Sequence, residues 1–258
     1  MKTPDTVPDK ITHPINPIII IVILATGIGA YVSMNTVSEE NVGIIAFIIS
    51  VSLAAGVSIS AFIVSKHNET GVLAKSYFVL GIGFMSYVIA EVLYYSLEEI
   101  FGIDPYPSFA DIFFFAVYPF TLIHLFLNIR YFNSGFTKFQ TFVITVIPII
   151  ASLAYTILSI TVADAELGFD FYYGLIFVVA ASTTLAFAIV GALTFRTGAL
   201  GVVWLLLVLG LMVNAAGDVW YYHLEIFGKY FDAHPVTIVW FIANMFMIYA
   251  LYKHLKII

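Results

Sequence analysis

The chain contains no cysteine and very little charge. The absence of cysteine among its 258 residues excludes disulfides, thiolate metal sites and cysteine nucleophiles, and leaves the redox compartment undetermined. Only 10% of the residues are charged, whereas a typical soluble domain has about a quarter. A formal net charge of −6 argues against nucleic acid as a partner. The sequence also lacks nucleophile-elbow, phosphate-loop and dinucleotide fingerprints, so we expect no cofactor.

Apolar residues dominate, at 62% of the chain with a mean hydropathy of +1.03. They fall into eight stretches, each near or above the roughly 20 residues that cross a bilayer core. The sequence therefore predicts an all-α, multi-pass protein of the cell membrane, with the lipid bilayer as its surroundings. The predicted membrane-spanning helices cover 15–34, 42–65, 72–97, 107–130, 139–162, 170–195, 200–226 and 234–254.

Lysine and arginine predict the orientation of these helices, because short cytoplasmic loops are enriched in them. Under this topology nine of the ten fall on one side of the membrane, and only Lys229 falls on the other. We therefore expect both termini to be cytoplasmic, with residues 1–14 as a cytoplasmic tail. The opposite side carries most of the acidic loop residues, so it should attract cations.

An octapeptide recurs in the two halves of the chain. The segment from Glu91 to Glu98 reads EVLYYSLE, and the segment from Asp218 to Glu225 reads DVWYYHLE, 127 residues later (218 minus 91). Gly83 and Gly210 match at the same offset, and Ile-Phe-Gly at 100–102 matches 226–228 after a one-residue deletion. The pattern predicts a tandem 4+4 repeat, with four helices in 15–132 and four in 133–258. Because four helices return the chain to its starting side, the copies should be related by an axis along the membrane normal.

Each copy of the octapeptide places an acid, two tyrosines and a second acid at i, i+3, i+4 and i+7, which share one face of a helix. An acid inside a membrane span is costly, and by default it indicates a functional site. The alternative is that Glu91 and Asp218 satisfy helix ends or each other. We expect an outward-facing, acidic, tyrosine-lined pocket for a small-molecule or lipid ligand. Its candidate binding residues are Glu91, Tyr94, Tyr95, Asp111, Tyr118, Asn214, Asp218, Tyr221, Tyr222 and Asn244.

Asp111 has a second interpretation. It follows Ser108 by three residues at the expected start of a helix, where serine caps the helix and an acid complements its dipole. Capping and ligand binding both remain open for this residue.

Histidines offer a weak case for a metal site. His223 and His234 lie near the predicted pocket, so an outer metal site is conceivable, but no histidine pair has the i, i+4 spacing of a zinc-binding helix. His124 and Asn128 are an i, i+4 polar pair, which is more typical of an interhelical hydrogen bond than of a ligand set.

The segment from Glu91 to Pro119 resembles a known membrane region. A P-x-P-S-x-A-D-x-F-Y-L-x-x-Y-P-like run that follows an acid in the third helix is matched at Pro105, Pro107, Ser108, Ala110, Asp111, Phe113, Tyr118 and Pro119, with Phe114 in place of the usual tyrosine. This is similar to the eight-helix sensor region that precedes GGDEF, EAL and histidine-kinase output domains in many bacterial signalling proteins. The second half is similar through Gly217, Asp218, Trp220, Tyr221, Gly228, Tyr230 and Trp240, whereas Thr237 replaces the family's usual acid.

The resemblance implies a sensor. Because no output domain accompanies it in this chain, it also implies a signalling partner in trans, in the membrane or the cytoplasm. A topological likeness to lysoplasmalogenase-type membrane proteins points instead to a lipid hydrolase with Glu91 and Asp218 as general acid and base. The leading hypothesis is a receptor-like, ligand-binding membrane module. The alternatives are that hydrolase and a proton- or cation-coupled carrier.

Overall fold

The computed structural model describes residues 15–103, 105–133, 135–161, 168–195 and 201–256. The predicted tail at 1–14 lies outside these residues. All the regular structure within them is helical. The elements are α1 (Pro17–Met34), α2 (Glu39–His67), α3 (Gly71–Tyr95) with a π-helical turn η1 (Ser96–Ile100), α4 (Phe109–Phe132), α5 (Lys138–Thr161), α6 (Phe169–Phe195), α7 (Gly201–Glu225) and α8 (Pro235–Leu255).

All eight α-helices are long and apolar enough to cross a membrane. The all-α multi-pass prediction is confirmed at this level, and most predicted boundaries agree within a few residues. Two ends differ for local reasons. The third span runs to Ile100 because η1 continues the helix with hydrogen bonds between residues five apart, such as Phe101 N–H to Ser96 O at 3.1 Å. The fourth begins at Phe109 rather than at 107 because Ser108 is its N-cap.

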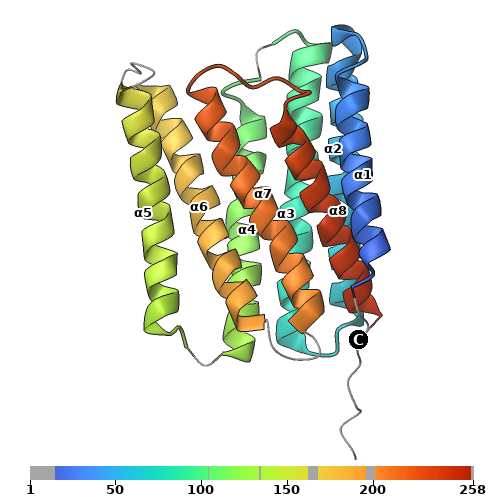
Figure 1. The fold of residues 1–258 in the computed structure, drawn as a ribbon, viewed down its shortest axis with the longest axis vertical. Helices are drawn as coiled ribbons and strands as arrows, with labels where there is room; N and C mark the ends of the chain where they lie inside the picture. Colours follow the sequence, from blue (N-terminus) through green and yellow to red (C-terminus); the bar gives the residue numbers. More distant parts are fainter. Residues whose placement is uncertain (1–14, 104, 134, 162–167, 196–200, 257–258) are drawn as a thin grey trace, which may run out of the picture.

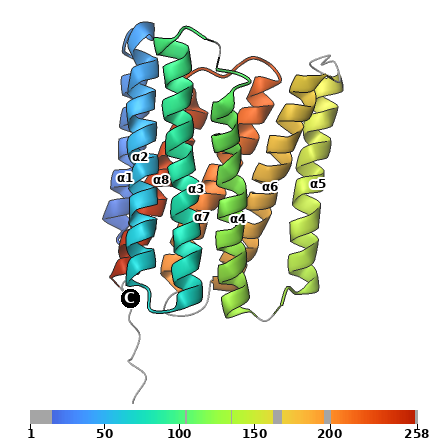
Figure 2. The same cartoon turned by 180° about the vertical axis from the view of Figure 1, so that it is seen from behind.

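The helices pack in two layers (Figures 1 and 2). α1, α8 and α7 lie on one face and α2, α3 and α4 on the other, with α6 and α5 at one edge. α3 packs between α2 and α4, and α7 packs between α6 and α8. The pairs α2·α8 and α4·α6 join these two groups, whereas α1 rests mainly on α8 and α5 on α6.

Large aliphatic and aromatic side chains cover the outside of the bundle. Ile18, Ile21 and Ile28 of α1 and Phe142 and Leu153 of α5 are each more than half exposed. Such a surface is stable against hydrocarbon rather than water. The exposed faces of α1 and α5 are therefore compatible with contact to lipid.

A ring cluster closes the centre of the bundle near one end. Tyr77 of α3 and Trp204 of α7 are fully buried, and their ring centroids lie 5.6 Å apart. His124 and His254 pack against both rings at 4.9 to 5.9 Å. α3 and α7 thus meet through side chains at this level.

Candidate functional site

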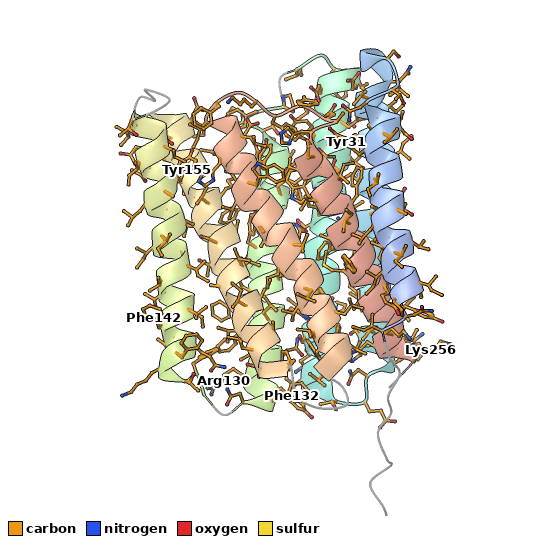
Figure 3. All side chains as sticks on the ribbon, in the orientation of Figure 1. Tyr31, Arg130, Phe132, Phe142, Tyr155 and Lys256 are labelled. Atoms are coloured by element: carbon orange, nitrogen blue, oxygen red, sulfur yellow. The ribbon has the colours of Figure 1, made fainter. Side chains whose placement is uncertain are left out.

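A cavity of about 600 Å³ lies between helices α2 to α8 at the opposite end of the bundle from the ring cluster. Figure 3 shows one of its wall residues, Tyr155, at the end of the molecule opposite Arg130 and Lys256. Its outermost acids are solvent-exposed, which makes that end its opening; they are Glu98, Glu99, Asp170, Glu225 and Asp232. Ligand pockets usually occupy about 300–1,000 Å³, so this one has room for a small molecule.

Nine of the ten predicted binding residues lie in the wall of this cavity. The exception is Asn244, which is buried in α8 one turn beyond Trp240 and donates its amide to the Trp240 carbonyl at 2.9 Å. The expectation that Asn244 lines the pocket is corrected. The residues that the structure brings together are Glu91, Tyr94, Tyr95, Asp111, Tyr118, Asn214, Asp218, Tyr221 and Tyr222.

Asp218 lies in the wall within a set of donors. The indole Nε1 of Trp240 donates to its Oδ1 at 2.9 Å, and the side chains of Tyr118 and Asn214 lie within hydrogen-bonding reach. Trp240 can take this position because residue 217 is glycine: a Cβ there would come within 2.8 Å of the indole nitrogen. These donors offset part of the cost of burying a charge on this carboxyl group.

Glu91 has a separate set of partners. Ser50 of α2 donates its hydroxyl to Glu91 Oε1 at 2.7 Å, and the Tyr87 hydroxyl lies within hydrogen-bonding reach. Beside them, Tyr95 stacks on Phe47 with ring centroids 4.1 Å apart. The two acids therefore share one cavity without bonding each other.

Ser50, Tyr87 and Trp240 are site residues that the sequence reasoning missed. Tyr87 lies 127 residues before Asn214, so it is the repeat equivalent of a residue that was predicted to bind the ligand. Trp240 was noted only as part of a family resemblance. Ser50 carried no signal, because it sits among the small residues of α2 that promote close helix packing.

Asp111 does cap α4. Its Oδ2 accepts from the Ser108 backbone N–H at 2.6 Å, while Ser108 Oγ accepts from Ala110 N at 3.1 Å. The capping interpretation is confirmed, and Asp111 also faces the cavity. The buried Tyr173 hydroxyl lies near Asp111 but completes no hydrogen bond of normal geometry within the described residues.

Aromatic rings form much of the wall. Tyr221 packs against Tyr230 with centroids 4.9 Å apart and against Trp240 at 5.5 Å. On the side formed by α6, Tyr222 packs against Phe177 at 5.0 Å. Edge-to-face and tilted contacts of this kind hold rings in fixed positions. The cavity wall is therefore firm as well as polar.

The electrostatics of the cavity are one-sided. Eight carboxylates and ten tyrosines line it, and none of the wall residues in the described chain is Lys, Arg or His. In the loop before α8, partial burial and the neighbouring Glu99 raise the pKa of Asp232 above its usual value. Burial also raises the pKa of Tyr230. The opening consequently brings acidic side chains close enough together for Glu99 to disfavour a second charge on Asp232.

Neither candidate metal ligand lies in the wall. His223 Nδ1 bonds the Val219 carbonyl at 2.7 Å on its own helix. His234 caps α8 by accepting from Val236 N at 3.2 Å and packs on Trp220. Across the described residues, no group of three or more His, Asp or Glu is arranged to hold a metal ion. Both histidines have structural roles.

The predicted interhelical bond of His124 and Asn128 is present. Ser76 Oγ lies 2.9 Å from His124 Nδ1 and accepts from Asn128 Nδ2 at 2.5 Å. All three side chains are buried. This cluster ties α4 to α3 near the ring cluster, away from the cavity.

Comparisons of the chain with known protein families, with curated proteins and with solved structures find no match. The resemblance to bacterial sensor regions and the likeness to lysoplasmalogenase-type proteins therefore remain predictions.

Proposed function

We propose that this protein is a receptor-like, ligand-binding module of the membrane that signals through a partner in trans. The observation that carries the proposal is the cavity, which collects nine independently predicted residues at one end of an otherwise apolar bundle. Intramembrane acids are expensive, and they typically mark ligand or ion sites. Here they converge on a volume suited to a small molecule.

The proposal includes a tandem repeat of helices α1–α4 and α5–α8. Two matched glycines support it. A Cβ at Gly83 would lie 3.7 Å from the Val117 carbonyl, and one at Gly210 would lie 3.1 Å from the Ala243 carbonyl. Val117 and Ala243 are 126 residues apart, the offset that the one-residue deletion predicts. Equivalent close approaches thus join α3 to α4 and α7 to α8.

The helix ends and the packing add to this support. Gly102 and Gly228, also 126 residues apart, have φ values of +61° and +56° after the equivalent helices. Such values favour glycine. The pairs α2·α3, α3·α4 and α2·α8 have the counterparts α6·α7, α7·α8 and α6·α4. Only α1 and α5, at the periphery, depart from the repeat.

The repeat suggests how a ligand could act at a distance. Tyr77 and Trp204 are repeat equivalents, and they meet where α3 and α7 approach each other. Glu91 and Asp218 each follow 14 residues later, about 21 Å along a helix. A ligand that contacts both acids would change the separation of α3 and α7 on the cavity side of the Tyr77–Trp204 contact. A rigid-body shift of one repeat against the other would carry that change to the opposite face.

We also propose that the cavity faces outward and that both termini are cytoplasmic. Arg130 and Lys256 lie at the end of the molecule opposite the cavity, as Figure 3 shows. Asn16 N–H donates to Tyr249 Oη at 3.1 Å, which holds the start of α1 beside the last turns of α8. Positive charge favours the cytoplasmic side, so the acidic opening would face outward.

Small-molecule screening tests the proposal. Purified protein in nanodiscs would be heated with a library of cationic, neutral and anionic compounds, beside an Ala46→Phe variant that adds a phenyl ring to the cavity wall. We expect at least one compound to raise the melting temperature of the parent and not that of the variant. If no compound of any charge class distinguishes the two proteins, the ligand-binding function is wrong.

A carrier is the second candidate, because one observation favours it. The cavity is open at one end, and the Tyr77–Trp204 ring cluster closes the other end between the two halves. A cavity that is open on one side and closed on the other is typical of an alternating-access carrier with parallel repeats. Uptake of a compound that passes the screen into protein-containing vesicles, with empty vesicles as the blank, would select the carrier over the receptor.

A further inference from the structure

The charge of the cavity disfavours anionic ligands. Its wall has eight carboxylates and, among the described residues, no cationic side chain. An anion entering it would leave water without gaining a partner of opposite charge, which is costly. A cleft lined with one sign of charge concentrates ions of the other sign. Both effects favour a cationic ligand.

The geometry favours an organic cation over a metal ion. A calcium or magnesium ion needs several oxygens converging at about 2.0–2.6 Å, and no group of three or more His, Asp or Glu among the described residues is arranged to hold one. The acids are instead spread around a volume of about 600 Å³, and Glu91 and Asp218 accept from different donors. A bulky cation could use such dispersed charges, whereas a bare metal ion could not.

The aromatic wall supplies the second kind of contact. The faces of tyrosine and tryptophan rings attract cations, most strongly when water is excluded. Trp240 places an indole directly beside the Asp218 carboxylate through its 2.9 Å hydrogen bond, and Tyr221 packs against that indole. An ammonium group beside Asp218 would meet a negative charge and aromatic rings together.

We propose that the cavity binds an organic cation: an ammonium group with an apolar body, held by Asp218, Glu91 and the faces of the surrounding tyrosines. This inference rests on the proposed ligand-binding function and specifies its ligand class. A soluble amine and an ammonium-bearing lipid headgroup share this chemistry, so the test separates the two sources.

Choline and its neutral carbon isostere, 3,3-dimethyl-1-butanol, are the decisive pair of probes. Isothermal titration calorimetry would use the full chain in choline-free nanodiscs, with empty discs as the blank. We expect choline to bind at least about tenfold more tightly than the alcohol, a difference of about 1.4 kcal/mol. Equal affinity of the two probes, or tighter binding of the alcohol, overturns the inference.

Tyr221 tests the aromatic contribution. Tyr221→Phe keeps the ring face and Tyr221→Leu removes it, so we expect choline affinity to be retained in the first and to fall several-fold in the second. The affinity of the alcohol should change little between the two variants, which separates a lost ring face from general damage to the wall. Equal choline affinity in both variants contradicts the proposed aromatic contact.

Phosphatidylcholine incorporated into the discs identifies the source. If it weakens the apparent affinity for free choline, the site takes a lipid headgroup; if it does not, the site takes a soluble cation. Both outcomes support the ligand class. If neutral or anionic compounds from the screen bind the parent but choline and other ammonium probes do not, the ligand class is wrong while the ligand-binding function stands. If nothing binds, both are wrong.

Discussion

Asp218→Asn is the substitution that best separates a ligand-binding acid from a structural one. It keeps the size of the side chain and one acceptor oxygen, replaces the other oxygen with an NH2 group and removes the charge. If Asp218 were half of a buried structural pair, removing the charge would cost about 3–5 kcal/mol. The structure argues otherwise, because the neighbours of Asp218 are the neutral donors Trp240, Tyr118 and Asn214.

The expected stability change follows from two opposing terms. Relief from holding an acid within the membrane span gains about 2.5–3.5 kcal/mol on an insertion scale. Each hydrogen bond that changes from charged to neutral loses about 1 kcal/mol, and Asp218 has three such donors. The terms nearly cancel, so the free energy of unfolding should change by about 1 kcal/mol or less, which is within about 4 °C of melting temperature.

Thermal melting and choline titration of Asp218→Asn in nanodiscs check this reasoning together. Binding should weaken about tenfold or more while the melting temperature barely moves. Glu69→Gln is the matched control, because Glu69 is an exposed acid in the α2–α3 loop, outside the cavity wall, and it should change neither quantity. A melting temperature about 10 °C below the parent, with binding retained, would show that Asp218 is structural.

Four further predictions follow from the fold and the cavity. Gly210→Ala should lower the melting temperature, because the new Cβ would lie 2.5 Å from Met247 Cγ; Gly29→Ala, which meets nothing within 4 Å, should not. The stability of the parent should fall as pH rises from the usual Asp range through the raised pKa of Asp232, because the folded state binds the proton of that carboxyl group more tightly than the unfolded state does. Asp232→Asn should make the melting temperature depend less on pH. Since the chain has no cysteine, a single cysteine can be placed in either loop. In intact cells an impermeant maleimide should label the Ile103→Cys variant and not the Glu69→Cys variant; the reverse result would invert the proposed topology. Purified protein should release no product from phospholipids or ether lipids, with or without chelator, whereas turnover lost in Glu91→Gln would establish the hydrolase.

The sequence determined the eight helices that are long and apolar enough to cross a membrane, because each needs only a local run of apolar residues. It also determined the cap of α4, since Ser108 and Asp111 act within a single turn. The repeat offset placed an acid and two tyrosines on one face of each of two helices, which is again a local consequence of helical periodicity. All ten candidate residues were named from the sequence, and the structure brings nine of them into one cavity.

Tertiary structure decided which groups those residues meet. Ser50 reaches Glu91 from α2, and Trp240 reaches Asp218 from α8 over Gly217, and no local pattern specifies such contacts. Asn244 shares the face of α8 that carries Trp240, but it lies one turn further along the helix, where it is buried and donates its amide to the Trp240 carbonyl. The cavity lies further along the bundle from the level where α3 and α7 meet at Tyr77 and Trp204, and side chains from α2 to α8 enclose it. Periodicity fixes which face of a helix is polar, whereas the packing of several helices fixes what that face encloses.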